Sequence, residues 1–379
     1  MRELELKKLI VDEFLGLIKD PRVERTRRHS LENILVISLL AVISGADSFV
    51  AIADFGRSKK DWLATFLDGL EDVPSHDTIG RVFAALDPRA LAEAFSRWTL
   101  AMRANTNEKL IAIDGKALRR AFRKAGDHAF VHMVSAWSTT NSVVLGQVKT
   151  DEKSNEITAI PQLLDLLDIN GALVSIDAAG AQTEIAEKIV SKGGDYLLAL
   201  KGNQPTLHAS VVDHFTGRGA ATRDLAFFET REKGHGREEI RRAWVSSDVS
   251  DADVAGAHQW PGLATLVRVE AIRTVRGETS RENRYFICSR GGLTAAEALG
   301  AVRSHWGIEN GLHWVLDVAF REDDCRVRAG NAAANFSAVR QLALSLLKQR
   351  TEAKVGIKNR RLRAAWDPAF LLRVVGIEA

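Results

Sequence analysis

The sequence predicts an α/β protein in which a mixed sheet carries helices and is preceded by an all-helical segment. Three observations lead to this prediction. Residues up to about 104 repeat their apolar side chains at helical spacing. From about residue 109 onward, short runs rich in β-branched residues alternate with amphipathic helical stretches, which is the pattern of a sheet with helices packed against it. Two of these runs, LIAID and LVSID, end in an acid, Asp114 and Asp177.

The N-terminal segment, residues 1–104, is expected to form a helical domain. Ser75 is a suitable N-cap for its fourth helix, and Asp77 is favourable in the first turn of that helix. Short helices joined by tight turns are typical of DNA-binding helix-turn-helix domains and also of small bundles without a DNA ligand. A basic run before the first long helix favours the DNA-binding role. The expected helices span 31–43, 49–55, 60–67, 78–86 and 88–102, and the basic run holds Arg22, Arg25, Arg27 and Arg28.

The order of elements after residue 105 is that of the ribonuclease-H-like fold. A strand is followed by a hairpin and then by two helix-strand units, which together form a mixed sheet. Between about 222 and 290 the chain becomes β-rich again, with turn signals at Gly234 to Gly236 and at Gly277. We interpret this stretch as a β insertion in a catalytic domain over 105–379. The predicted strands span 110–113, 130–137, 143–149, 173–176 and 196–200, and the helices span 156–167 and 183–191.

The two strand-end aspartates, Asp114 and Asp177, are candidate ligands of a shared metal. A carboxylate at the end of a buried strand is costly to desolvate unless a cation or a hydrogen-bond network meets it. Together with a third carboxylate, such a pair can hold two Mg²⁺ ions about 3.5–4 Å apart. Mn²⁺ is expected to substitute, because an all-carboxylate site favours hard octahedral ions.

A third acid, Glu309, lies in a helix-compatible stretch over 294–320. A solvated polar face is the simpler interpretation of polar residues at helical spacing, but two tryptophans beside the stripe, Trp306 and Trp314, argue against plain exposure. We therefore expect this helix to bring Glu309 to the two aspartates. Side chains four residues apart share one helical face, and this stripe holds His305, Glu309, His313 and Asp317.

Three further groups have open roles. The first group, Lys201, Asn203 and Gln204, follows the strand at 196–200, where DNA phosphates are expected; DNA contact and an ordinary polar loop are equally supported. The second group, His235 and Arg237, occupies a glycine-flanked tip that can reach DNA, although the glycines also suit a hairpin turn, which is slightly favoured. The third group, Glu322, Asp323 and Asp324, could compete with Glu309 for the role of third metal ligand, but a surface charge run is favoured.

Composition limits the alternatives. The formal net charge is only +3, so the total is weak evidence for a nucleic-acid partner, while basic clusters at 116–124 and 358–363 can follow phosphates. Two cysteines, Cys288 and Cys325, form no CxxC pair, which argues against a disulfide scaffold and fits a reducing compartment. The apolar run at 34–46 is too short to cross a membrane. No signal-peptide pattern begins the chain, so a cytoplasmic location is expected.

Several long motifs stand out along the chain: PSHDTIGRVF, DGKALR, EKSNEITAIPQLLDLL, GGDYLLALKGNQ, GHGREEIR and HWGIENGLHWVLDVAFREDDCRVR. They resemble those of the ISAs-type transposases of bacterial insertion sequences, also called H-repeat-associated proteins. The resemblance runs over nearly the whole chain. It implies a DDE triad of Asp114, Asp177 and Glu309, a helical associated domain at the N-terminus, and metal-dependent DNA strand cleavage and strand transfer. The partner is then double-stranded DNA, at the element ends and at the target, with a homodimer assembled on it.

One departure from the wider cut-and-paste group concerns the residues around Glu309. Members of that group often have Tyr, Arg and Lys at fixed distances from the catalytic Glu. At the corresponding positions relative to Glu309, this chain has Val302, His305 and Leu316. His305 could replace the Arg as a phosphate contact.

Two other functional classes remain open. A catalytically inactive, DNA-binding descendant of a transposase would share the same motifs. A zinc hydrolase could use His305, Glu309 and His313 as ligands, but it would leave the two strand-end aspartates unexplained.

Overall fold

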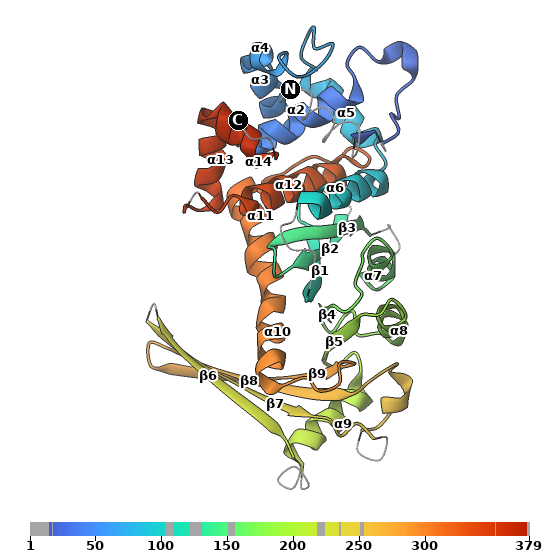
Figure 1. Cartoon of the computed structure of the whole chain (residues 1–379), viewed down its shortest axis with the longest axis vertical. Coiled ribbons are helices and arrows are strands. Elements are labelled where there is room, and N and C mark those ends of the chain that lie inside the picture. The colour runs from blue at the N-terminus through green and yellow to red at the C-terminus, as the bar shows by residue number, and fades with distance from the viewer. Residues whose placement is uncertain are drawn as a thin grey trace. The chain divides into compact units, whose positions relative to one another are not determined.

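The chain folds into two compact units, seen in the computed structural model (Figure 1). The structure describes residues 15–16, 18–102, 109–120, 131–150, 156–217, 224–234, 236–250, 254–352 and 354–376. The first unit lies within 1–106, 115–155 and 309–379, and we call it the bundle unit. The second lies within 107–114 and 156–308, and we call it the sheet unit.

Helix α12 is the centre of the bundle unit. It packs against α2, α5 and α6, and its residues 332–347 are all buried. Ser75 caps α5 by accepting from the backbone N–H of Thr78 at 3.3 Å, as the sequence predicts. The helices of this unit are α2 (Leu31–Ile43), α3 (Phe49–Ser58), α4 (Lys60–Leu63), α5 (His76–Ala85), α6 (Pro88–Met102), α11 (Trp314–Phe320), α12 (Ala332–Gln349), α13 (Ile357–Trp366) and α14 (Pro368–Val374).

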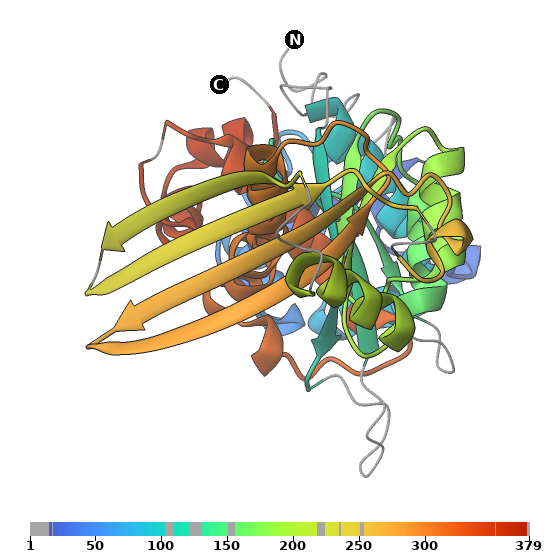
Figure 2. The same cartoon turned by 90° about the horizontal axis from the view of Figure 1, so that it is seen from below.

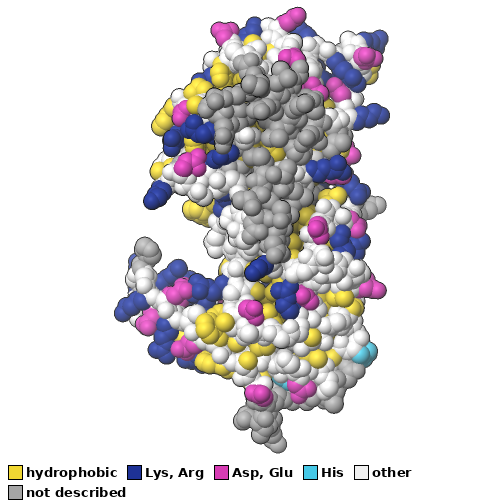
Figure 3. Space-filling view, in the orientation of Figure 1, with side chains coloured by type: hydrophobic (Ala, Val, Ile, Leu, Met, Phe, Trp, Pro, Cys, Tyr) yellow, Lys and Arg dark blue, Asp and Glu magenta, His cyan; other side chains and the backbone are white. Residues whose placement is uncertain are grey.

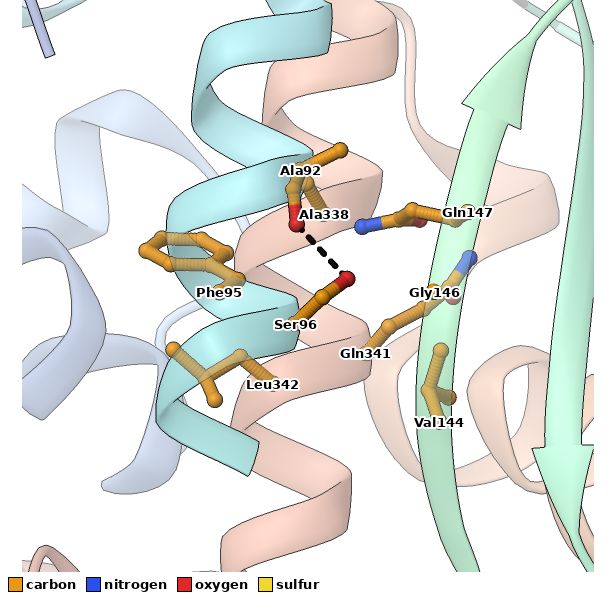
Figure 4. Close-up of a pocket in the computed structure, with 9 residues that line it drawn as sticks. All are labelled: Ala92, Phe95, Ser96, Val144, Gly146, Gln147, Ala338, Gln341 and Leu342. Carbon is orange, nitrogen blue, oxygen red and sulfur yellow. Dashed lines mark hydrogen bonds between the residues drawn. The ribbon is translucent and has the colours of Figure 1, made fainter. Parts of the chain in front are cut away.

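The hairpin of β2 (Val131–Ser138) and β3 (Val143–Lys149) completes the bundle unit, with α6 and α12 packed against β3. Figure 4 shows the layer where these elements meet, in which Ser96 Oγ donates to the carbonyl of Ala92 at 2.9 Å. The gap left there is about 10 Å³. That volume is close to the space of a single water, so this layer is packed core rather than a substrate pocket.

Three parallel strands form the centre of the sheet unit. β4 (Leu173–Ile176) pairs with β1 (Leu110–Leu118) on one side and with β5 (Asp195–Leu200) on the other. In the chain, α7 (Glu156–Asp165) follows the β2–β3 hairpin and leads into β4, and α8 (Thr183–Ser191) connects β4 to β5. β1 passes from the sheet unit into the bundle unit after residue 114, and the strand order reads β3-β2-β1-β4-β5 along the chain's sheet. This mixed order, with an antiparallel hairpin before the parallel strands, is the predicted ribonuclease-H-like fold.

The β insertion consists of two long hairpins, which Figure 2 shows side by side in yellow and orange. Strand β9 pairs with β5, and the order continues through β8 and β7 to β6 at the edge. Helix α10 (Ala295–Ile308) covers one face through a core that includes Val245, Val267 and Phe286. The new elements are α9 (Pro205–Thr216), β6 (Ala226–Gly234), β7 (Arg237–Ser246), β8 (Thr265–Val275) and β9 (Glu278–Cys288).

None of the helices in the described part of the chain is long and apolar enough to cross a lipid bilayer.

Candidate active site

The strand register brings Asp114 and Asp177 together. In the parallel pair of β1 and β4, Ile113 lies opposite Ile176, and each aspartate is the next residue of its strand. Neighbouring strands run about 5 Å apart, so the two backbones present their aspartates at the same level. Both isoleucines are buried and both aspartates are half-buried. The two aspartates therefore lie at the same level of the sheet. Asp177 follows the end of β4, as the sequence predicts, but Asp114 lies inside β1, because the strand continues to Leu118, so the predicted strand end at residue 113 is wrong.

The Asp177 carboxylate is held by the backbone of its own loop. Oδ1 accepts the N–H groups of Ala179 at 3.1 Å and Gly180 at 3.3 Å. Gly180 is buried, and a Cβ on it would lie 2.4 Å from Ile176 Cγ2 and 2.9 Å from Ile160 Cδ1. Only glycine therefore fits at position 180, and this close packing keeps the loop against Ile176 and Ile160. The two backbone hydrogen bonds both use Oδ1 of Asp177.

Two of the predicted DNA-contact residues fasten this same loop. The side-chain amide of Asn203 donates to the carbonyl of Ala178, and that of Gln204 donates to the carbonyl of Ala181 at 3.0 Å. Their amide groups therefore have a structural role that the sequence did not reveal. Lys201, two residues before Asn203, is exposed.

His305 lies beside the aspartate pair in the sheet unit. Its Nδ1 is 3.0 Å from Ser175 Oγ, and Ser175 Oγ in turn donates to the carbonyl of Ile111 at 3.4 Å. A hydroxyl has one proton, so the imidazole Nδ1–H is the donor to Ser175 and Nε2 carries the lone pair. Burial lowers the pKa of His305, although nearby Asp177 acts in the opposite direction. The prediction that His305 replaces the Arg as a phosphate contact stays a prediction.

Glu309 begins a π-helical turn in the bundle unit. Helix α10 ends at Ile308, the turn spans Glu309–His313, and α11 follows. The expected helix over 294–320 is therefore interrupted, because a π turn inserts an extra residue into the helical ladder. Glu309 is exposed. The tryptophans predicted to shield the stripe are exposed too, Trp306 by 39% and Trp314 by 61%.

The acids after Glu309 pair with basic residues in and just after β1. Glu322 is only 3% exposed, so the prediction of a surface charge run is wrong for this residue. Its carboxylate and that of Asp317 bind the ammonium of Lys116, so Glu322, one of the three acids that could have competed with Glu309, is engaged in an ion pair. Asp323 and Asp324 do form exposed or half-exposed pairs, with Arg119 at 3.4 Å and Arg120 at 3.3 Å.

The described residues contain no cluster of three or more His, Cys, Asp or Glu side chains arranged to hold a metal ion. Among these residues, neither the triad of Asp114, Asp177 and Glu309 nor the zinc alternative of His305, Glu309 and His313 forms such a cluster. Asp114 and Asp177 supply a pair of oxygen ligands, which is the donor type that Mg²⁺ and Mn²⁺ prefer.

The basic run before α2 divides into two kinds of side chain. Arg22 binds Asp20 at 2.8 Å and the carbonyl of His29 at 2.9 Å, and Arg27 binds Asp20 at 3.4 Å. Arg25 is exposed, and the Arg28 side chain is 79% exposed while lying 3.7 Å from Asp72. A cavity of about 440 Å³ is lined here by Arg22, Arg28, His29, Asp72, Val73, Ser75, Thr78, Arg81 and Val82.

The predicted basic contacts on the β insertion and near the C-terminus differ in whether they are exposed. Arg237 is exposed where β7 begins, opposite Gly234, and His235 between them lies outside the described residues. Gly236 has a φ of 73°, which supports the turn interpretation of these glycines. Figure 3 shows Lys and Arg side chains gathered over the insertion, with acidic ones between them. In the C-terminal cluster, Arg361 is 4% exposed and bonds to Asp47 at 2.9 Å, so it belongs to the core of the bundle unit.

Comparisons with known proteins agree over nearly the full length. Residues 13–99 match the family model DDE_Tnp_1-associated, and residues 105–346 match the model of the transposase DDE domain. The chain is 41% identical over 376 residues to two proteins of Escherichia coli K12, "Putative protein YbfL" and "H repeat-associated putative transposase YhhI", covering 98% of each chain. It is 40% identical to "Putative transposase YncI" of Escherichia coli O157:H7, over 96% of this chain and 93% of that one.

Among solved structures, the chain is similar to a piggyBac transposase in a synaptic complex with hairpin DNA. The TM-score is 0.48 at 10% identity, over 98% of this chain and 80% of that one.

Proposed function

The chain belongs to the family of DDE-domain transposases, and we propose that it cleaves and joins DNA strands at the ends of a bacterial insertion element. In this proposal Asp114, Asp177 and Glu309 are the metal-binding carboxylates. The observation that supports it best is the register of β1 and β4, which sets Asp114 of β1 at the same level as Asp177, the residue that follows β4. Glu309 joins them on the strength of the family motif HWGIENGLHW.

Two Mg²⁺ ions, or Mn²⁺ in their place, would be bound by these carboxylates and would polarise the attacking and leaving oxygens at a phosphate. The chain's own part is to place ligands. Asp177 is oriented by two backbone N–H groups through Oδ1, which leaves its other oxygen available to a cation. No side chain acts as a nucleophile. Water attacks phosphorus and the 3′ oxygen leaves with the electrons of the broken bond; the freed 3′-hydroxyl then attacks a target phosphodiester in the same way.

Recognition of the element ends is assigned to the helical domain over 1–104, and further DNA contacts to exposed basic residues elsewhere. Double-stranded DNA at the ends and at the target is the partner, and a homodimer assembled on DNA in the cytoplasm is the working form. Phosphate contacts need charged side chains that solvent can reach. The exposed candidates are Arg25 and Lys201, together with Arg28, 3.7 Å from Asp72, and Arg237, 3.2 Å from Glu239.

The test uses purified full-length protein and a duplex carrying the terminal repeats found in the DNA that flanks the gene. Mg²⁺ or Mn²⁺ should support strand cleavage, EDTA should stop it, and added Mg²⁺ should restore it. Asp114→Ala should abolish cleavage while circular dichroism and the melting temperature stay near those of the wild type. Asp324→Ala is a matched control, because Asp324 is an exposed acid paired with Arg120.

Each alternative has its own outcome in this assay. Activity restored by Zn²⁺ alone would support the zinc hydrolase. A wild-type protein that binds the repeat duplex specifically but cleaves it with neither metal would support the inactive descendant. Full cleavage by Asp114→Ala contradicts the proposed site.

A further inference from the structure

A buried ion cluster in the bundle unit links β1 to the segment that follows Glu309. Lys116 lies two residues after Asp114, and its Nζ donates to Asp317 and, at 3.0 Å, to Glu322. The same ammonium donates to the carbonyl of His313 at 3.4 Å, the last residue of the π-helical turn. One side chain of the strand therefore holds both the end of the turn and the helix that follows it.

Charge keeps this cluster intact. Burial alone would lower the pKa of Lys116, but the carboxylates of Glu322 and Asp317 outweigh it and raise that pKa. Burial raises the pKa of Asp317 against the lowering effect of Lys116. Lys116 is accordingly an ammonium at neutral pH, with three N–H donors for the three oxygens around it.

The cluster continues into the core through hydrogen bonds. Glu322 Oε1 accepts from Ser337 Oγ at 2.8 Å, and Gln341 Nε2 also donates to Ser337 Oγ at 3.4 Å. Ser135 of β2 donates to Gln341 Oε1 at 3.2 Å. All four side chains are buried. A buried network with satisfied partners specifies one arrangement, because any displacement leaves a polar group unpaired in a low-dielectric interior.

A second contact fixes the middle of the same turn. A Cβ on Gly311 would lie 3.2 Å from Trp137 Cζ2 and 3.5 Å from Lys348 Nζ, so the turn approaches β2 closely at this glycine. The Lys348 ammonium lies 4.9 Å from the centre of the Trp137 ring. The turn is held at its middle and at its end, while Glu309 at its start is exposed.

We propose that Lys116 is a positioning residue that joins the strand bearing Asp114 to the turn bearing Glu309, and that Asp317 and Glu322 act on cleavage through it. The proposal rests on the proposed function, since it concerns the placement of Glu309 as a ligand. Lys116, Asp317 and Glu322 touch neither metal nor DNA in this role. Outer residues that orient a metal ligand affect metal affinity and rate, although they form no bond to the ion.

A cluster that only stabilises the fold makes a different prediction. Replacing all members of a buried ion cluster by neutral residues of similar size often preserves stability, whereas removing one member leaves an unpaired buried charge. Stability and positioning can therefore be separated by changing the whole cluster at once.

The experiment compares Asp317→Asn and the triple variant K116M/D317N/E322Q with the wild type, all full length. Single-turnover cleavage of the terminal-repeat duplex is measured as a function of Mn²⁺ concentration, Mn²⁺ affinity by calorimetry without DNA, and the melting temperature in parallel. We expect both variants to keep a near-wild-type melting temperature while cleavage rate and Mn²⁺ affinity fall about 10- to 100-fold. Asp324→Asn is the control, because Asp324 pairs the same segment with exposed Arg120, two residues after β1, at 3.3 Å, and it should behave as the wild type.

Wild-type Mn²⁺ affinity and cleavage in a folded triple variant overturn the positioning role. Should the triple variant fail to fold, Asp317→Asn decides the question, because it keeps the Lys116–Glu322 pair and its side chain is 31% exposed. The Mn²⁺ affinity also separates the two proposals. A wild-type protein that binds Mn²⁺ but cleaves no DNA contradicts the proposed function, while the affinity change in the variants still tests Lys116.

Discussion

The Asp177 loop and the Glu309 turn present a carboxylate in opposite ways. Asp177 is half-buried, and its Oδ1 is fixed by N–H groups two and three residues later in the chain. Glu309 is exposed, and the turn it begins is held through Gly311 and the carbonyl of His313 by residues of distant segments. The first arrangement is local to the backbone, and the second depends on tertiary packing.

This difference has a consequence for catalysis. A ligand fixed by its own loop keeps its place whenever the strand forms. A ligand on a packed turn can be displaced by changes far from it, and a displacement of about 1 Å at a reacting group can cost about 100-fold in rate. We therefore expect the Glu309 side of the proposed site to be the more sensitive to distant substitutions, and the Asp177 side to be the more sensitive to substitutions in its own loop.

The largest expected effect comes from removing each carboxylate. Asp177→Ala and Glu309→Gln should both abolish cleavage, because each is a proposed ligand, but their effects on stability should differ. Asp177→Ala removes the acceptor of two backbone N–H groups, one exposed and one partly buried, and should lower the free energy of unfolding by about 1 kcal/mol. Glu309→Gln changes an exposed side chain and should stay within about 0.5 kcal/mol of the wild type. Urea unfolding and the cleavage assay measure both; normal cleavage by Glu309→Gln would remove Glu309 from the triad.

The same contrast explains what the sequence could predict. The Ser75 cap, the β insertion and most strand bounds follow from residues near one another in the chain, and the proposal of Asp114 and Asp177 as ligands has the same origin, although β1 continues past Asp114 to Leu118. The ion pair of Lys116 and Glu322 joins residues 206 positions apart, and no local pattern indicates it. The π-helical turn was missed for a related reason, because its residues suit an α-helix and packing of Gly311 on Trp137 accompanies the wider turn. Asn203 and Gln204 resembled DNA contacts because only the fold brings them to the Asp177 loop.

Alanine at two glycines tests the supports themselves. Gly180→Ala places a Cβ 2.4 Å from Ile176, so the Asp177 loop must move, with a loss of about 1–3 kcal/mol in stability and about 100-fold in cleavage rate. Gly311→Ala meets Trp137 at 3.2 Å, which needs only a small shift. We expect its cleavage rate to fall about tenfold, with a smaller loss of stability.

Gly300→Ala is the matched control for both glycines. Gly300 lies inside α10, and a Cβ on it would have no neighbouring atom within 4 Å, so alanine there should stabilise the helix by about 0.5–1 kcal/mol and leave cleavage unchanged. A Gly180→Ala protein with wild-type cleavage would show that the loop does not set the position of Asp177.

The two cysteines report on local opening in the two units. Burial raises the pKa of the Cys288 thiol to about 12, and the residue is fully buried in the sheet unit. At pH 8 only about one thiol in ten thousand would then be the reactive thiolate, even with access. Cys325 follows the acidic turn of the bundle unit and is partly exposed. Iodoacetamide should modify Cys325 in the native protein and Cys288 only in urea, as mass spectrometry of peptides can show; early modification of Cys288 would mean that β9 opens readily.

The smallest expected effect separates committed from available arginines in the basic run. Arg28 is largely exposed, so Arg28→Gln should remove at most one phosphate contact and lower the salt dependence of DNA binding by about 0.9 in the log–log slope. Arg22 is committed to Asp20 and to the carbonyl of His29, and Arg22→Gln should instead lower stability with little change in that slope. Arg97→Gln, which removes an exposed arginine of α6 paired with Glu93 at 2.8 Å, is the control for loss of charge alone. If Arg28→Gln and Arg97→Gln give the same slope as the wild type in anisotropy titrations across salt, the phosphate contacts lie outside this run, and Arg237 at the tip of the insertion becomes the residue to change.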